Sequence, residues 1–167
     1  MIRSVCAALL FLSVTAGAAS AQSVVYLVRH AERADAGMAA AKMTGADPEL
    51  SPAGQSRAAA LAEVLKDARI SAIYTTEYKR ARDTAEPLAR AAGVPVTVVS
   101  SKDAAGLVEK VKSTTGNVLV VGHSNTVPDV LKALGVAEPV TIGEGEYDRL
   151  FVVVRGTPPT LLRLRYR

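Results

Sequence analysis

The sequence predicts an α/β protein whose mostly parallel sheet ends in an antiparallel pair of strands. Short apolar runs without polar alternation, at residues 24–28 and 118–121, are typical of strands buried on both faces of a sheet. Segments with helical spacing lie between such runs, and this alternation indicates parallel strands. The turn residues Gly, Thr, Pro and Pro at 156–159 separate two last strands and indicate an antiparallel hairpin at the end of the chain.

The helices are predicted from their spacing and from their end signals. Ser51 and Pro52 suit an N-cap and a first helical position, and Gly93 and Gly135 suit helix ends. Pro87 falls inside a helical segment, so we expect a kink there or two helices that meet near Glu86. The predicted strands are 24–28, 70–74, 95–99, 117–121, 150–154 and 161–166, and the predicted helices are 52–67, 78–92, 104–112 and 127–134.

Residues 1–21 have the pattern of a secretory signal peptide. A short basic start precedes an apolar run at 5–14 and a small-x-small site at Ala19-Ser20-Ala21. The alternative is a buried N-terminal helix. We expect cleavage to leave residues 22–167 as one exported domain, periplasmic or secreted, without stable membrane association. Cys6 and Arg3 leave with the leader, so no disulfide is available, and the formal net charge falls from +4 to +3. That charge is too small to indicate a nucleic-acid partner.

Basic side chains follow three of the predicted strands. The chain has two histidines: His30 follows the first strand, and His123 follows the fourth after one glycine. Parallel strands end at the same edge of a sheet, where ligands bind in such folds, so both imidazoles should lie on one rim. Arg29 ends the first strand, and Arg80 comes near the start of the helix after the second. Lys79, Arg80 and Arg82 are alternatively a solvated helix face.

Three motifs together resemble the histidine phosphatase superfamily, also called the phosphoglycerate-mutase-like fold. They are Val-Arg-His-Ala-Glu at 28–32, Tyr-Thr-Thr-Glu-Tyr-Lys-Arg-Ala-Arg-Asp-Thr-Ala at 74–85, and Gly-His-Ser at 122–124. Each motif stands after the expected strand, which makes the combination specific. The resemblance implies a three-layer α/β/α sandwich with a mostly parallel sheet of about six strands, one of them antiparallel.

The resemblance also implies a mechanism and its residues. His30 is then the nucleophile that forms a covalent phosphohistidine, while Arg29, Arg80 and His123 hold the phosphoryl oxygens. Ser124, Asn125 and Glu146 complete the substrate-binding set, and Glu32 is expected to pair with a rim arginine or to orient an imidazole. Positive side chains suit the spread charge of a phosphoryl transition state. No metal or other cofactor is expected, because the chain lacks a clustered set of metal ligands.

The proton donor departs from the family pattern. In the acid phosphatases of the superfamily an aspartate follows the second histidine, and this chain has Ser124 there. Mutase-like members carry a glutamate after the third strand, where Asp103 is the nearest candidate. Asp103 is equally suited to the N-cap of the next helix. The rival candidates are Glu144, Glu146 and Asp148, which precede the strand at 150–154.

The leading hypothesis is an exported, metal-independent phosphomonoesterase that acts on a small-molecule phosphate ester. The alternatives are a phosphohistidine protein phosphatase, a non-catalytic phosphate-ester binding module suggested by Ser124, and a secreted scaffold without a phosphate site. The loops at 33–50 and 138–148 should shape specificity, and the sequence indicates neither the substrate nor the oligomeric state.

Overall fold

The computed structural model describes residues 22–35 and 47–167. The predicted leader at 1–21, and residues 36–46 of the predicted specificity loop, lie outside the described residues. No helix in the described part of the chain is long and apolar enough to cross a membrane.

The described residues form six strands and four helices in the predicted order. The strands are β1 (Val24–Arg29), β2 (Ile70–Thr75), β3 (Val96–Val98), β4 (Asn117–Gly122), β5 (Arg149–Val154) and β6 (Thr160–Arg165). The helices are α1 (Pro52–Leu65), α2 (Lys79–Ala92), α3 (Ala104–Ser113) and α4 (Thr126–Ala133). Ser51 caps α1 as expected, since its side chain accepts a hydrogen bond from the Gly54 N–H.

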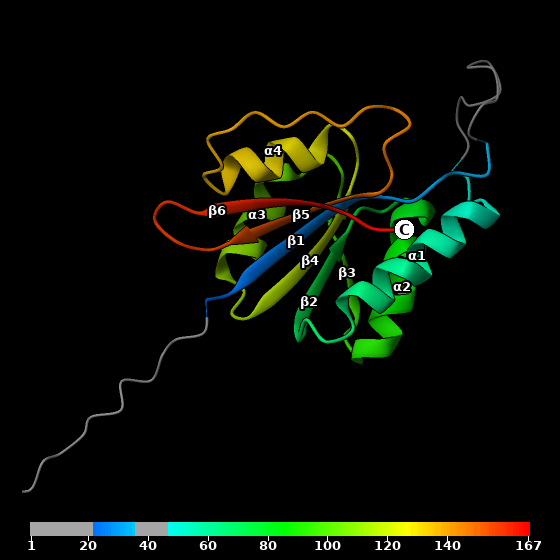
Figure 1. Ribbon diagram of the computed structural model, residues 1–167, viewed down its shortest axis with the longest axis horizontal. Coiled ribbons are helices and arrows are strands. Elements are labelled where there is room, and N and C mark those ends of the chain that lie inside the picture. The colour runs from blue at the N-terminus through cyan, green and yellow to red at the C-terminus, as the bar shows by residue number, and fades with distance from the viewer. Residues whose placement is uncertain (1–21, 36–46) are drawn as a thin grey trace, which may run out of the picture.

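The strands form one sheet in the order β3-β2-β4-β1-β5-β6 (Figure 1). The pairs β2–β3, β2–β4 and β1–β4 are parallel, whereas β5 is antiparallel to both β1 and β6. Of the described strands, β5 is therefore the one that runs against the others. The predicted parallel sheet with one antiparallel strand is confirmed.

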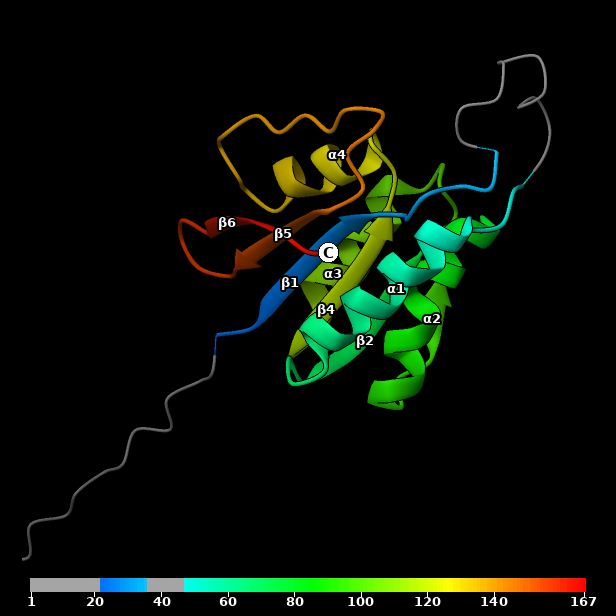
Figure 2. The ribbon, with the colours of Figure 1, turned by 45° about the vertical axis from the view of Figure 1, so that its right-hand side comes forward.

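Helices cover both faces of this sheet and make the three predicted layers. The helices α1 and α2 lie together on one side, and α3 and α4 lie on the other (Figure 1 and Figure 2). Leu61 of α1 and Leu88 of α2 belong to one apolar core with Ile73 and Leu119 of the sheet. Leu107 of α3 and Leu131 of α4 belong to the second core. Strands buried on both faces explain why their sequences show no polar alternation.

Helix α2 corrects one expectation from the sequence. It runs as a single helix through Pro87 and ends at Gly93, whose φ of 66° is left-handed. The division into two helices near Glu86 is therefore wrong. Buried residues lie on both sides of the proline, including Thr84, Ala85 and Leu88, and this packing holds both halves of the helix against the sheet.

The carboxyl ends of β1 and β4 lie side by side and position the two histidines. Arg29 is in register with Gly122, and the His30 N–H donates to the Gly122 carbonyl at 2.9 Å. A Cβ at position 122 would lie 2.7 Å from Oγ1 of Thr126, so only glycine allows α4 to begin this close to β4. The residues that follow both strands therefore face the same pocket.

Candidate active site

A polar pocket of about 300 Å³ lies at the carboxyl ends of β1, β2 and β4. It brings together six of the predicted site residues, Arg29, His30, Arg80, His123, Ser124 and Asn125. Arg33, Tyr78, Ser101, Thr126 and Glu144 complete its lining. A larger cavity of about 450 Å³ between α1 and α2 contains neither histidine.

His30 is buried and held in one tautomer by the main chain. Its Nδ1 lies 2.8 Å from the carbonyl oxygen of Ala31, and a carbonyl can only accept, so Nδ1 carries the proton. The neutral ring then has its lone pair on Nε2. Burial lowers the pKa of His30 to about 3, and the positive charges of Arg80 and Arg29 act in the same direction. At neutral pH, His30 is therefore uncharged and its Nε2 lone pair is available.

His123 lies next to His30, with ring centroids 5.2 Å apart at 63°. Its Nε2 is 2.9 Å from Oγ1 of Thr76, which follows β2, and the ring edge of Tyr78 packs on it at 5.3 Å. Burial and the charge of Arg80 together lower the pKa of His123 to about 4. Both imidazoles are thus neutral hydrogen-bonding groups above pH 5.

NMR spectroscopy can test these pKa values, because residues 22–167 contain no other histidine. We expect neither imidazole to titrate above about pH 5 in the absence of anions, against an ordinary value of about 6.5. Inorganic phosphate should raise both midpoints, since an anion offsets the arginine charges. In the unfolded chain the two histidines bind protons near pH 6.5, whereas in the folded protein they bind them only at lower pH. The unfolding free energy should therefore fall as the pH drops from about 6.5 toward 4. A histidine that titrates near pH 6.5 would contradict the described burial.

Arg29 joins the pocket to the loop before β5. It is 5% exposed, its Nη1 donates to the carbonyls of Gly143 and Glu144 at 2.8 Å each, and its guanidinium stacks 4.3 Å from the Tyr147 ring. Its Nε is buried and has no hydrogen-bond partner among the described residues. A buried donor without a partner is costly, so this group requires an acceptor.

Arg80, at the start of α2, has the same incomplete bonding. Its guanidinium lies 4.3 Å from the Tyr78 ring, and its Nε is also buried without a partner in the described part of the chain. Its Nη1 forms an ion pair with Asp47 at 3.5 Å. Burial and the neighbouring charge of Arg33 lower the pKa of Arg80. Two arginines whose buried Nε donors are unsatisfied, beside the first residues of α4, form a site for an anion.

The sequence model of the histidine phosphatase superfamily, branch 1, matches residues 25–103, which contain both arginines and His30. The chain belongs to the histidine phosphatase superfamily. It is accordingly a phosphatase that acts through a phosphohistidine intermediate. A comparison with curated proteins finds no match for the sequence.

Solved structures of histidine phosphatases share the fold. A mycobacterial glucosyl-3-phosphoglycerate phosphatase is 19% identical with a TM-score of 0.64, over 86% of this chain and 98% of that one. A structure from Agrobacterium tumefaciens described as the putative phosphohistidine phosphatase SixA is 23% identical with a TM-score of 0.62, over 86% and 97%. At these identities the similarity shows a common architecture along nearly the whole length of both relatives.

Asp103, predicted as the proton donor of this histidine phosphatase, lies at the N-cap of α3. Its Oδ1 accepts a hydrogen bond from the Gly106 N–H at 2.9 Å, and its side chain is exposed. It does not line the pocket. The structure therefore places Asp103 where the alternative interpretation expected it, as a helix cap.

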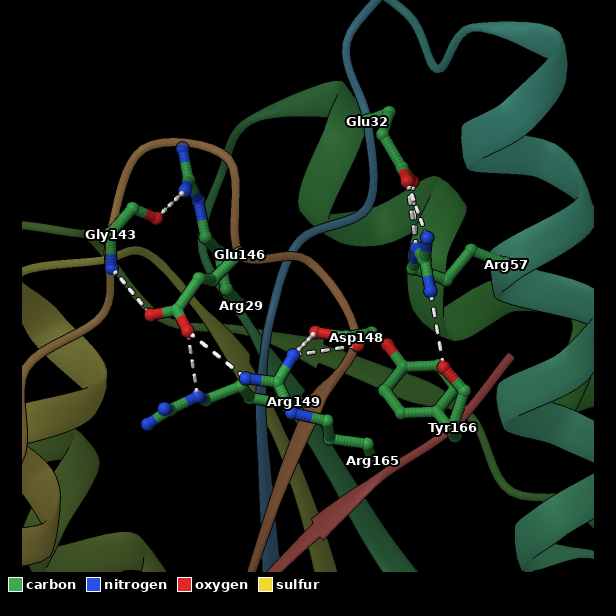
Figure 3. A network of polar contacts seen from close by, with 9 residues as sticks. All are labelled: Arg29, Glu32, Arg57, Gly143, Glu146, Asp148, Arg149, Arg165 and Tyr166. Carbon is green, nitrogen blue, oxygen red and sulfur yellow. Dashed lines mark hydrogen bonds and ion pairs between the residues drawn. The ribbon is translucent and has the colours of Figure 1, made fainter.

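Glu146 and Asp148 are engaged in contacts that hold the loop before β5 (Figure 3). Glu146 accepts from the Gly143 N–H at 2.9 Å and pairs with Arg149 at 3.1 Å. Asp148 pairs with Arg165 of β6 at 2.9 Å. Neither carboxylate lines the pocket, so the structure does not bring Glu146 to the substrate.

Glu144 is the predicted carboxylate that does line the pocket. Its Oε2 lies 3.4 Å from Nη2 of Arg29, and its side chain is 93% exposed. The antiparallel direction of β5 explains this placement, because the amino end of β5 lies at the carboxyl end of β1. Among the described residues, Glu144 is the acidic side chain of the pocket lining.

Glu32 corrects a second expectation. Its carboxylate receives bidentate hydrogen bonds of 2.7–2.9 Å from Arg57 of α1, and it contacts neither a rim arginine nor an imidazole (Figure 3). Arg57 also donates to the carbonyl of Tyr166 at 3.1 Å. A Cβ at Gly54 would lie 2.2 Å from the Glu32 carbonyl, so α1 begins against this segment. Glu32 therefore ties the segment after β1 to α1 and the chain end.

Replacing Glu32 by Gln should lower stability without changing ester binding. The pair is mostly buried, with side chains 18% and 21% exposed, so its loss should cost about 1–3 kcal/mol of unfolding free energy. Urea unfolding measures that cost, and Glu63→Gln, which alters the exposed pair with Lys66, is the control and should change stability by less than about 1 kcal/mol. A raised KM with unchanged stability would instead place Glu32 at the substrate.

The sequence did not single out Arg33, Thr76, Tyr78, Ser101 and Tyr147 as site residues. Arg33 directly follows the first motif and Tyr78 lies within the second, so their proximity to the pocket could have been inferred. Tyr147, whose ring centroid is 6.0 Å from that of His30, reaches the site through the antiparallel strand β5. No local pattern indicates that contact.

No group of three or more His, Cys, Asp or Glu side chains that could hold a metal occurs among residues 22–35 and 47–167.

Proposed function

We propose that this protein is an exported phosphomonoesterase that transfers the phosphoryl group of a small ester to Nε2 of His30 and then to water. The observation that carries the proposal is a neutral His30, with Nδ1 protonated, beside two arginines whose buried Nε donors have no partner among the described residues. A free ring nitrogen beside a site for an oxyanion is the arrangement that phosphoryl transfer requires.

In the first half of the reaction, Arg29, Arg80 and His123 bind the non-bridging oxygens of the phosphoryl group. Nε2 of His30 attacks phosphorus as the P–O bond to the alcohol breaks, and the positive charge around the phosphoryl oxygens stabilises the transition state. The departing alkoxide needs a proton. Glu144 lines the pocket and is the carboxylate we assign to this transfer.

In the second half, water attacks the phosphorus of phosphohistidine and the P–N bond breaks. Glu144, now ionised, accepts a proton from the water, and the Nε2 lone pair returns to the neutral ring. Arginine side chains supply the charge stabilisation that a metal ion provides in other phosphatases, and this supports a metal-independent reaction.

Replacing Glu144 by Gln should slow esters of poorly acidic alcohols about 100-fold and para-nitrophenyl phosphate less than about 10-fold, since the latter leaves without protonation. Steady-state kinetics with phenyl and para-nitrophenyl phosphate measure this difference, and Glu146→Gln serves as the matched control in the same loop. Equal slowing of both esters by Glu144→Gln would remove Glu144 from the proton-transfer role.

A phosphohistidine protein phosphatase is the second candidate, favoured by the similarity to the structures described as SixA. The signal-peptide pattern at residues 1–21 speaks against it, because it supports export away from cytoplasmic phosphorelay proteins. Detection of a mature chain that begins at Gln22 in the periplasm or medium would support export, and retention of an uncleaved chain in the cytoplasm would oppose it.

The activity test uses residues 22–167 with para-nitrophenyl phosphate in excess chelator, beside a phosphorylated histidine-containing protein. We expect turnover of the ester that the chelator does not reduce. Loss of activity with chelator and recovery with a divalent metal would overturn the metal-independent scheme. No turnover, with phosphate still raising the melting temperature, would identify a binding module.

A further inference from the structure

A third arginine lines the pocket beyond the two that the phosphoryl group requires. Arg33 belongs to the pocket lining, and its side chain is fixed by Asp35 through bonds of 2.7 Å from Nε to Oδ1 and 2.6 Å from Nη2 to Oδ2. Asp35 is itself buried at 8% exposure. The main chain is fixed as well, since Arg33 bridges Leu50 and the Ala34 N–H donates to the Glu49 carbonyl at 2.9 Å.

Asp35 orients the guanidinium of Arg33 but binds only two of its three nitrogens. The bidentate pair occupies Nε and Nη2, and Nη1 has no hydrogen-bond partner within residues 22–35 and 47–167. A planar guanidinium held on one side by a carboxylate presents its remaining donors in a fixed direction. Arg33 is therefore a preorganised donor at the pocket and not a flexible surface side chain.

Arg33 lies near a second positive charge, that of Arg80, which is unfavourable unless an anion binds between them. Arg33 lies close enough to Arg80 for its charge to lower the pKa of Arg80, and Glu144 and Tyr147 act on Arg33 from the loop before β5. With both histidines neutral, Glu144 is the carboxylate of the lining, while Asp35 and Asp47 pair with Arg33 and Arg80 from outside it. Because Asp35 leaves Nη1 of Arg33 without a partner among the described residues, this donor remains for a further negative group in the pocket.

The rest of the lining favours a compact and polar substrate. The pocket is about 300 Å³, and Ser101, Ser124, Asn125 and Thr126 contribute hydroxyl and amide groups to it. A site of this size, with few apolar walls, does not match a long acyl chain or a nucleobase.

We infer that Arg33, oriented by Asp35, binds a second anionic group of the substrate, so that the preferred ester carries a carboxylate or a second phosphate one short carbon chain from the scissile phosphate. This inference rests on the proposed function, because it takes the phosphoryl group to lie at Arg29, Arg80 and His30. Arg33 is a specificity residue in this scheme, and Asp35 is a positioning residue.

Binding to His30→Ala protein tests the inference without turnover. Isothermal titration would compare 2-phosphoglycolate and ethane-1,2-diol bisphosphate with 2-hydroxyethyl phosphate, which has the same carbon skeleton and no second anion. Three-carbon homologues of each probe test a longer distance between the two anionic groups. Each titration is repeated with Arg33→Gln and with Arg82→Gln, which removes an exposed arginine from α2.

We expect at least one bianionic ester to bind about 10- to 100-fold more tightly than the hydroxyethyl ester, the factor given by a charge-assisted hydrogen bond. Arg33→Gln should reduce that preference to less than about 3-fold and leave the hydroxyethyl ester nearly unchanged, while Arg82→Gln preserves the preference. The probe that loses most affinity identifies the second group as carboxylate or phosphate.

Three outcomes would overturn the inference: no preference in the parent protein, equal weakening of all probes by Arg33→Gln, or the same effect from Arg82→Gln. A failure of the proposed function is distinguishable from these outcomes. If the bianionic preference depends on Arg33 but the protein with His30 intact hydrolyses none of the probes, the phosphatase mechanism fails and the second anion site stands. If the protein hydrolyses the probes but shows no preference for bianionic esters, the phosphatase mechanism stands and only the proposed role of Arg33 is wrong.

Discussion

Replacing His30 by Ala should lower kcat for para-nitrophenyl phosphate by roughly 10⁴- to 10⁶-fold, the range seen when a covalent nucleophile is removed. The reason is specific to this side chain: its Nδ1 proton is fixed by the Ala31 carbonyl, and its pKa of about 3 keeps Nε2 available at neutral pH. No other imidazole in the pocket can substitute, because Nε2 of His123 is already bonded to Thr76.

The control for His30→Ala is phosphate binding. Arg29 and Arg80 remain in the variant, so phosphate should still raise its melting temperature. Rapid quench of the wild-type protein with a labelled ester should trap an acid-labile phosphoenzyme that the variant lacks. A variant that retained most of the activity would show that another group attacks phosphorus.

Replacing Arg80 by Gln should lower kcat/KM by roughly 100- to 1,000-fold, comparable with the loss of one oxyanion-stabilising donor. The side chain of Arg80 is 12% exposed, its buried Nε has no partner among the described residues, and desolvation lowers its pKa. Its ion pair with the partly exposed Asp47 contributes little to folding, so the unfolding free energy without ligand should stay within about 1 kcal/mol of the wild-type value. Replacing Arg80 should thus reduce activity strongly and change the unfolding free energy little.

Thermal unfolding with and without phosphate checks the expectation for Arg80. Phosphate should stabilise the wild-type protein and the Arg82→Gln control, and it should stabilise Arg80→Gln much less. Arg82 is the matched control because it lies two residues further along the same helix and is exposed. A large loss of stability in Arg80→Gln without ligand would show that the arginine is structural.

The residues that the sequence predicted best are those whose position follows from strand direction alone. His30 and His123 each follow a buried parallel strand, and parallel strands end at one edge, so their proximity needs no knowledge of side-chain packing. The same rule places Arg29 and the start of α2 at the pocket. The elements were predicted because apolar runs, caps and glycine ends are local signals.

The residues that the sequence misplaced depend on partners far along the chain. Glu32 pairs with Arg57, 25 residues away, and this choice depends on how α1 crosses the end of β1. Asp103 is the exception, because its partner, the N–H of Gly106, is local and the sequence offered both interpretations. Pro87 is tolerated because the sheet holds the helix on both sides of it. Such outcomes depend on tertiary packing that a single sequence does not display.

The tautomer of His30 depends on a carbonyl of the neighbouring peptide and on no side chain. A substitution elsewhere in the pocket can change charge, size or reach without removing that acceptor. The tautomer of His30 is in this way independent of substitutions in the surrounding side chains. A fold with this property can acquire new substrates by changing the loops around an unaltered reaction centre.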